Sequence, residues 1–369
     1  MTCIGSYNSI RKLIFYIIRI IKFVMNIFYT TNGLMVNSSL LNKPSYYFNV
    51  CSARKFLRKR DFLHYGSQLV PERLGSETWS MAWAYIREID DIIDRNIGCD
   101  KQLDILSREW SIYKDILDGS SLKVYGERIY IRHLWMTQFL ENLFKYYDSE
   151  EQKIVLDSIE KLYRSAVLDS KRRGKVLPLH KLLYLTKLKA VYFFKIFFIL
   201  SRLNLNHYMD KISEFLGMGL GLLDDLIDLI YDWRINYINV SLEELRSAGL
   251  NVNDKHLLSK ILSNKDIFWK KSLQILRVLL SARILALQVK DPIARNLVLR
   301  LTEVFAAPIL QGKPIPGSTY LFRGGKILMK ILPEDEMKAY EVGHKIVRKV
   351  LAIPQISPML VKFWIKIIG

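Results

Sequence analysis

The segment "MAWAYIREIDDIIDRN" (residues 81–96) places three aspartates among isoleucines, in a stretch whose apolar spacing predicts a buried helix. A second segment, "GLGLLDDLIDLIYDW" (219–233), combines acidic and aliphatic residues in the same way. Unpaired carboxylates are costly to bury, because loss of water disfavours the charged form and raises the pKa. The two segments therefore predict that a cation binds between two acidic helices.

The aspartates of each segment fall on one face of a helix. At 3.6 residues per turn, Asp90 and Asp94 lie about 40° apart around the helix axis. Asp224, Asp228 and Asp232 follow one another at intervals of four residues, so they also form a stripe. Acidic stripes are common on solvated helix faces. Two of them within strongly apolar helices without interspersed lysines favour a buried cation site.

The chemistry of these side chains predicts a magnesium site. Mg²⁺ binds carboxylate oxygens, keeps several water ligands and commonly bridges carboxylates to substrate phosphates; Mn²⁺ is an alternative ion. An EF-hand calcium loop is excluded, since its ligand spacing and central glycine are missing. The candidate metal ligands are Asp90, Asp91, Asp94, Asp224, Asp228 and Asp232.

The composition is that of an ordered chain with an anionic partner. Half of the 369 residues are hydrophobic and 12% are aromatic, which suits a large core. Lys and Arg exceed Asp and Glu by 55 − 36 = 19, which favours nucleic acid, anionic lipid or a phosphorylated substrate as the partner. No nucleic-acid-binding motif is recognisable, so we expect no nucleic acid partner. The sequence also lacks P-loop, dinucleotide, GxSxG and HExxH motifs.

Basic residues are concentrated at the N-terminus, where residues 1–60 contain ten of them and no acidic residue. We expect residues 1–45 to be an organelle-targeting leader, a membrane-surface segment or an ordinary first helix. The C-terminal stretch "ISPMLVKFWIKIIG" (356–369) is also basic and apolar, and either contacts a membrane peripherally or packs as a last helix. The expected location is membrane-associated or organellar (mitochondrial or plastid), and otherwise cytoplasmic.

Apolar residues recur at helical spacing along nearly the whole chain, and alternating strand patterns are scarce, so the predicted fold class is all-α. Residues 46–369 are predicted to form a single helical domain, with a loop at 312–334 that contains "GKPIPGS". The expected helices span residues 75–95, 101–118, 127–147, 151–168, 179–203, 208–233, 255–264, 267–289, 292–311 and 335–351.

The stretch "HYGSQLVPERLGSETWSMAWAYIREIDDIID" (64–94) resembles the opening motif of squalene/phytoene synthases. That motif has leucine and proline in its lead-in, then aromatic residues, and an arginine three positions before the aspartates. Further along, Asp169 and Tyr184 match the family's aspartate followed fifteen residues later by a tyrosine. The matching residues of the opening motif are Ser67, Leu69, Pro71, Trp83, Tyr85, Arg87 and the aspartates from Asp90 to Asp94.

The second acidic segment is similar to the family's other motif, NxxxDxxxD, and is followed by "NYINVSLEEL" (236–245). It departs from the family pattern in having Asp224 in place of the asparagine, Ile227 in place of an internal arginine and Tyr237 in place of a later one. The family's Gly-rich turn is replaced by "KLKAVYFF" (187–194). These changes leave fewer phosphate-binding residues on the second side.

The resemblance implies a member of the trans-isoprenyl diphosphate synthase superfamily, with a class I isoprenoid synthase helical bundle around a central apolar cavity. It implies a Mg²⁺-dependent prenyltransferase of isoprenoid biosynthesis that condenses two molecules of farnesyl or geranylgeranyl diphosphate head to head. NADPH is needed for squalene and not for phytoene, and the sequence does not decide between them. The catalytic residues implied are Arg87, Asp90, Asp94, Asp224 and Asp228. The expected substrate-binding residues are Ser67, Tyr85, Arg87, Lys187, Lys189, Tyr192 and Phe193.

Several basic residues have a second interpretation. Lys187 and Lys189 lie in an otherwise apolar segment, and they either face the substrate or extend to the surface. Arg172 and Arg173 either bind phosphate or belong to a solvated loop.

Two alternative functions stay open at this level. One is a class I terpene cyclase or a chain-elongating prenyl diphosphate synthase, because "LGMGLGLLDDLID" (216–228) also resembles the second motif of chain-elongating enzymes. The other is a non-catalytic assembly factor for a mitochondrial complex that reuses the same fold. The basic leader favours the assembly factor, whereas the retained aspartates count against it.

Overall fold

The computed structural model describes residues 45–60, 62–95, 97–119, 130–203, 208–310 and 329–353. All regular elements within these ranges are helices, which confirms the predicted all-α class. The predicted leader lies outside the described residues except at Ser45, and the apolar C-terminal stretch lies outside them entirely. Within the described part of the chain, no helix combines the length and apolar character that crossing a membrane requires.

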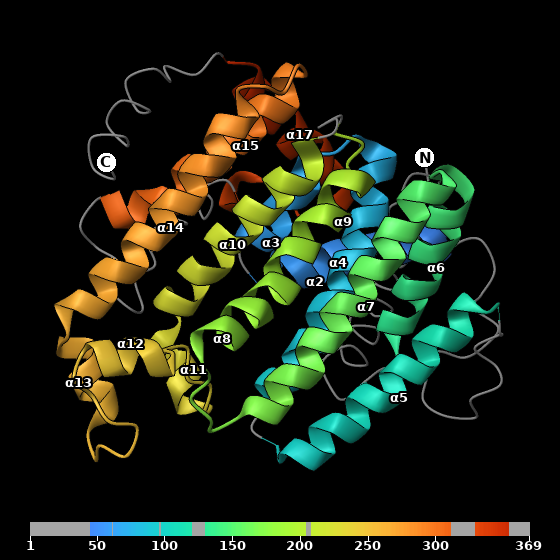
Figure 1. Ribbon diagram of the computed structural model, residues 1–369. Helices are drawn as coiled ribbons and strands as arrows, with labels where there is room; N and C mark the ends of the chain where they lie inside the picture. The colour runs from blue at the N-terminus through green and yellow to red at the C-terminus, as the bar shows by residue number, and fades with distance from the viewer. Residues whose placement is uncertain are drawn as a thin grey trace, which may run out of the picture.

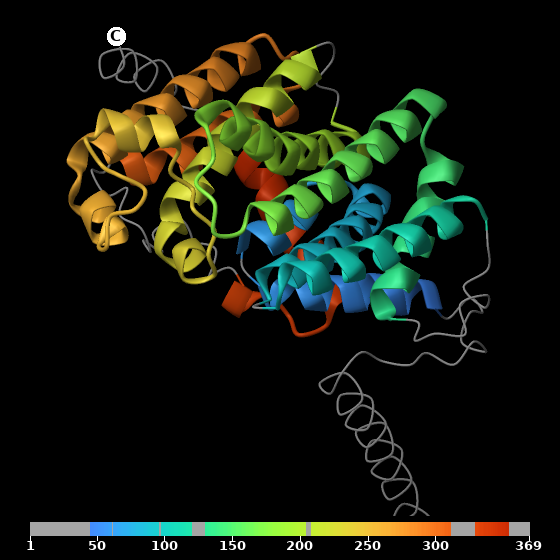
Figure 2. The same cartoon turned by 60° about the horizontal axis from the view of Figure 1, so that its bottom comes forward.

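The helices are α2 (Ser45–Arg58), α3 (Phe62–Gly66), α4 (Arg73–Asp94), α5 (Cys99–Leu117), α6 (Ile131–Tyr146), α7 (Ser149–Arg172), α8 (Leu179–Thr186), α9 (Tyr192–Leu200), α10 (Met209–Ile227), α11 (Leu229–Arg234), α12 (Leu242–Ser247), α13 (Leu257–Ser263), α14 (Lys265–Ala286), α15 (Pro292–Leu310) and α17 (Glu336–Ala352). A short 3₁₀ turn, η2 (Ser67–Leu69), follows α3, and a π-helical turn, η4 (Lys187–Val191), joins α8 to α9. Figures 1 and 2 show α14 and α15 on one side of the molecule and α5 and α6 on the other.

The predicted helices agree with the observed ones to within a few residues, apart from two that are modified in the middle. The helix expected at 179–203 contains the π-helical turn, and the helix expected at 208–233 is interrupted at Asp228, where α10 ends and α11 begins. The backbone bonds from Asp228 N to Asp224 O (2.9 Å) and from Asp232 N to Asp228 O (2.8 Å) continue across this break. The second acidic stripe is therefore preserved.

Helix α4 lies in the middle of the fold because most of its faces are buried. Trp79, Met81, Ala82 and Ala84 are inaccessible to solvent, and the helix packs against α2, α6, α7 and α9. A side of α4 near its C-terminal end instead carries the first acidic motif, so the helix joins a packed core to a polar surface.

Helix α10 uses glycines to approach its neighbours closely. A Cβ atom at Gly217 would lie 2.5 Å from the Val191 Cα atom, and one at Gly221 would lie 2.6 Å from the Thr186 Cγ2 atom. Gly219 lies against α14, where a Cβ atom would be 2.3 Å from the Leu279 side chain. The repeated glycines of this segment thus bring the π-helical turn and α14 against α10.

Replacing Gly217 with alanine should destabilise the chain, because the added Cβ atom meets backbone atoms of the π-helical turn that cannot rotate away. We expect a loss of about 1–3 kcal/mol in the free energy of unfolding. Urea unfolding followed by circular dichroism measures it. The control is Lys211→Ala on the exposed side of the same helix, where we expect a change within about 0.5 kcal/mol. Equal stabilities of the two variants would contradict the close packing.

Candidate active site

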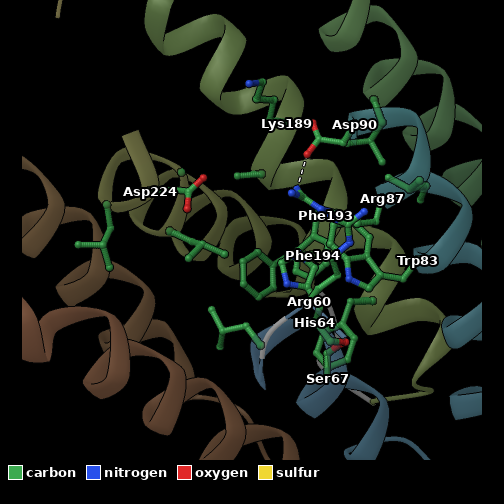
Figure 3. A pocket seen from close by; sticks show the side chains of 18 of the residues that line it. Arg60, His64, Ser67, Trp83, Arg87, Asp90, Lys189, Phe193, Phe194 and Asp224 are labelled. Atoms are coloured by element: carbon green, nitrogen blue, oxygen red, sulfur yellow. Dashed lines mark hydrogen bonds and ion pairs between the residues drawn. The ribbon is translucent and has the colours of Figure 1, made fainter. Parts of the chain in front are cut away.

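A cavity of about 1220 Å³ lies between α4, α7, α9, α10, α15 and α17. Acidic and basic side chains occupy one end of it and aromatic side chains the other, as Figure 3 shows for Asp90, Arg87 and Lys189 against Trp83 and Phe193. Helices α4 and α10 form facing walls, since Asp224 lies across the cavity from Asp90 (Figure 3). The cavity thus separates a charged region from an apolar one.

The first acidic motif is paired with arginines. Arg87, one turn earlier on α4, forms an ion pair with Asp90, and its guanidinium lies 3.6 Å from Asp91 and 3.9 Å from Asp94. Arg60, which follows α2, forms an ion pair with Asp91. Sequence patterns did not indicate a role for Arg60, because it belongs to a basic run with no motif of its own. Two arginines thus neutralise much of the charge of this motif.

The second acidic motif is held mainly by neutral hydrogen-bond donors. The Thr186 hydroxyl donates to Asp225 Oδ2 (3.1 Å), and the Asn239 amide donates to Asp232 Oδ2 (2.5 Å). Asn239 lies in the loop between α11 and α12 and is buried. These bonds fix two carboxylates in place and supply no positive charge to balance them.

Burial and neighbouring carboxylates raise several carboxyl pKa values. Burial and then the charge of Asp90 raise the pKa of Asp94 to about 6. Burial and then the charge of Asp228 raise the pKa of Asp224 to about 7. Burial and nearby carboxylates raise the pKa of Asp232 to about 8. These side chains line the cavity, where neighbouring protein atoms displace part of their hydration, although Asp224 remains exposed to solvent.

A buried ionic network supports the second motif from behind. Asp169 of α7 forms ion pairs with Lys189 and with Arg172, whose Nε atom lies 2.5 Å away. Burial opposes ionisation of Asp169, but Lys189 and Arg172 hold its pKa below the ordinary value. Arg172 also donates to Asn239 Oδ1 (2.8 Å), so the network reaches Asp232 through Asn239.

The Arg172–Arg173 pair closes the end of α7 rather than lying in a solvated loop. Arg172 is buried in the last turn of α7, and Arg173 donates to the backbone carbonyl oxygens of Ile235 (2.9 Å) and Ile97 (2.8 Å). Both arginines therefore tie α7 to the loops beside it. The expectation of a solvated loop is wrong, since Arg172 is 5% exposed.

Stacked aromatic rings form the apolar end of the cavity. The Trp83 ring lies parallel to the rings of His64 and Trp79, with centroids 5.6 and 5.5 Å away, and meets Phe193 edge-on at 4.5 Å. The Trp83 indole nitrogen is buried and has no hydrogen-bond partner among the described residues. Tyr85, expected to bind substrate, also lines the cavity and shares a hydrogen bond with Tyr163. This wall offers ring faces and few polar atoms.

The cavity brings together most of the predicted site residues. Lys187 and Tyr192 are not among its described lining residues, and the Lys187 ammonium instead lies 2.6 Å from Glu214 Oε1. The hydroxyl of Ser67 lines the cavity but already accepts from the Trp79 indole (2.9 Å). The predicted residues that line the cavity are Ser67, Tyr85, Arg87, Asp90, Asp91, Asp94, Lys189, Phe193, Asp224, Asp228 and Asp232. Lining residues outside the predicted site set include Arg60, His64, Trp83, Phe197, Asp225 and Arg300.

The donor set fits Mg²⁺ in its chemistry. In the described part of the chain, no three histidine, cysteine or acidic side chains are gathered closely enough to hold a metal ion by themselves. The candidates are nevertheless all carboxylates that line one cavity, and they supply the oxygen ligands that Mg²⁺ prefers. Because Mg²⁺ retains water and binds phosphate oxygens, carboxylates on separate helices can serve one diphosphate without enclosing the ion.

The metal-free chain should lose stability as the pH rises, because Asp224 and Asp232 hold protons in the folded state that the unfolded chain, with a carboxyl pKa of 3.8, has released. Their contribution to the free energy of unfolding is present below pH 3.8 and is lost as the pH rises through about 7 to 8. Thermal unfolding in EDTA across this range measures it. Asp232→Asn should flatten the decline, whereas Asp157→Asn, on the surface of α7, should leave it unchanged. A decline of wild-type steepness in Asp232→Asn would contradict the assignment.

Comparisons with known proteins agree on the fold. No family model and no curated protein sequence matches the chain. A dehydrosqualene synthase crystallised with a ligand superposes with a TM-score of 0.58 at 13% identity, covering 84% of this chain and 98% of that one. The squalene synthase HpnC of Alicyclobacillus acidocaldarius gives a TM-score of 0.55 at 13% identity, covering 74% and 98%. The predicted resemblance is confirmed at the level of structure: this chain has the all-helical isoprenoid synthase fold of squalene and dehydrosqualene synthases.

Proposed function

We propose that the chain is a Mg²⁺-dependent prenyltransferase that joins two prenyl diphosphates head to head. The observation that carries the proposal is the division of one cavity into a charged end and an aromatic end. A prenyl diphosphate has the same division, with a highly charged head and a long apolar tail. Farnesyl or geranylgeranyl diphosphate is the proposed substrate, as the sequence motifs imply.

The charged end supports departure of the diphosphate. Arg87 and Lys189 present cationic donors from α4 and from the π-helical turn, where they can balance the charge that develops on the leaving group. When bound, Mg²⁺ would be held by the aspartates of the two motifs and would neutralise diphosphate oxygens as a Lewis acid. Asn239 and Thr186 orient the carboxylates of the second motif, so these ligands need little rearrangement.

The aromatic end supports the cation left on the prenyl chain. The ring faces of Trp83 and Phe193 attract positive charge, and the apolar walls exclude the water that would quench it. A cavity of about 1220 Å³ exceeds the usual 300–1,000 Å³ of small-ligand sites, which suits two prenyl chains better than one.

Removing a carboxylate from either motif should abolish release of diphosphate. With Mg²⁺ and farnesyl or geranylgeranyl diphosphate, the wild-type chain should release pyrophosphate, and Asp90→Asn or Asp228→Asn should lower the rate by about 100-fold or more. A coupled pyrophosphate assay measures the rate. Asp157→Asn on the outer surface of α7 is the matched control and should retain wild-type activity. Similar rates in all four proteins would instead favour the non-catalytic assembly factor.

Replacing Trp83 with leucine should change the product more than the rate. The smaller side chain opens the aromatic wall to water and removes a ring face, so part of the prenyl cation should be captured as prenyl alcohol. Mass spectrometry of the extracted products measures the ratio of alcohol to coupled hydrocarbon. An unchanged ratio would mean that Trp83 does not shield the cation.

Identifying the wild-type product also separates the remaining alternatives. A coupled hydrocarbon of twice the substrate's carbon number supports head-to-head condensation. A cyclic hydrocarbon from one substrate indicates a class I terpene cyclase, and a longer diphosphate indicates a chain-elongating synthase. Running the assay with and without NADPH distinguishes a squalene-type from a phytoene-type product.

A further inference from the structure

Lys189 is the one lysine among the described residues that line the cavity. It is carried by the π-helical turn between α8 and α9, in the segment where the sequence departs from the Gly-rich turn of squalene/phytoene synthases. A π-helical turn inserts a residue into a helix and is often found at functional sites. Gly217 and Gly221 of α10 hold this turn tightly against the helix that carries the second acidic motif.

Lys187, two residues earlier, provides a contrast. Its ammonium pairs with Glu214 Oε1 at 2.6 Å, and both side chains are nearly half exposed. Lys189 is 40% exposed and pairs instead with Asp169, whose side chain is 1% exposed. The two lysines are therefore similarly accessible, but they differ in partner, and Lys189 is the one that lines the cavity.

The ion pair with Asp169 does not fully neutralise the charge of Lys189. Arg172 is already paired with the same carboxylate, so two cations share one anion. Lys189 lines the same cavity as Asp94 on one wall and Asp224 on the other. Its positive charge therefore acts on both acidic motifs, and it lowers the pKa of both carboxyls.

We propose that Lys189 is a resident cation at the charged end of the cavity, which competes with divalent metal for the second acidic motif and binds the anionic head of the substrate once metal is present. Only the identity of that anion, a diphosphate, rests on the proposed function. A fixed ammonium among carboxylates weakens their attraction for a free cation, because the two positive charges repel each other. The same ammonium strengthens the binding of an anion after metal has neutralised the carboxylates.

Two binding constants measured on the full chain by calorimetry test the proposal. In Lys189→Met, the Kd for Mn²⁺ without any anion should fall by about tenfold. In the same variant at saturating Mn²⁺, the Kd for inorganic pyrophosphate should rise by about tenfold. Opposite shifts are the signature of a shared cation, since structural damage would weaken both interactions. Lys187→Met is the matched control and should leave both constants unchanged.

The single variant keeps the buried network charge-balanced, because Asp169 remains paired with Arg172. Lys189→Arg keeps the positive charge and should restore wild-type values. Unchanged constants in Lys189→Met, or weakening of both interactions in it, overturn the proposal. The calorimetry uses no prenyl substrate, so its result does not depend on enzyme activity. If the two Kd values shift in opposite directions but the chain releases no diphosphate, the proposed function is wrong and the role of Lys189 is still supported.

Discussion

The gathering of carboxylates in one cavity is the constraint on which this structure depends. The described lining of the cavity contains seven aspartates against four arginines and one lysine, which is a net charge of −2. Burial, and then neighbouring carboxylates, raise the pKa values of Asp224 and Asp232. In the proposed function, a divalent cation would offset this negative charge.

The two motifs meet this constraint in different ways. On α4, Arg87 and Arg60 balance the aspartates from within the chain. At the second motif, Asn239 and Thr186 orient the carboxylates through neutral hydrogen bonds. Lys189 contributes a positive charge there and also forms an ion pair with Asp169. The orientation of the second motif thus comes from neutral donors as well as from charge. The close packing of the π-helical turn on the glycines of α10 makes that orientation possible.

Sequence patterns predicted most of this arrangement, because helices and acidic stripes both follow from residue spacing. They failed where tertiary partners decide the outcome. Lys187 and Lys189 were both expected to bind substrate, yet residues two apart on a helix lie about 200° apart around its axis, so both cannot face one cavity. Arg172 looked like a solvated loop residue because its partner, Asn239, is distant in sequence. Arg60 lay in a basic run that gave no indication of a partner on α4.

The departures from the family pattern change which charged residues accompany the second motif. An aspartate at position 224, where the family has asparagine, adds a negative charge, and Lys189, where the family has a Gly-rich turn, adds a positive one. Both residues line the same end of the cavity, and the lysine lowers the pKa of the aspartate. Ile227 and Tyr237 stand where that pattern has arginines, so two positive charges are also missing from the second side. Lys189 therefore offsets the charge of Asp224 but leaves the second motif more negative than the pattern that it resembles.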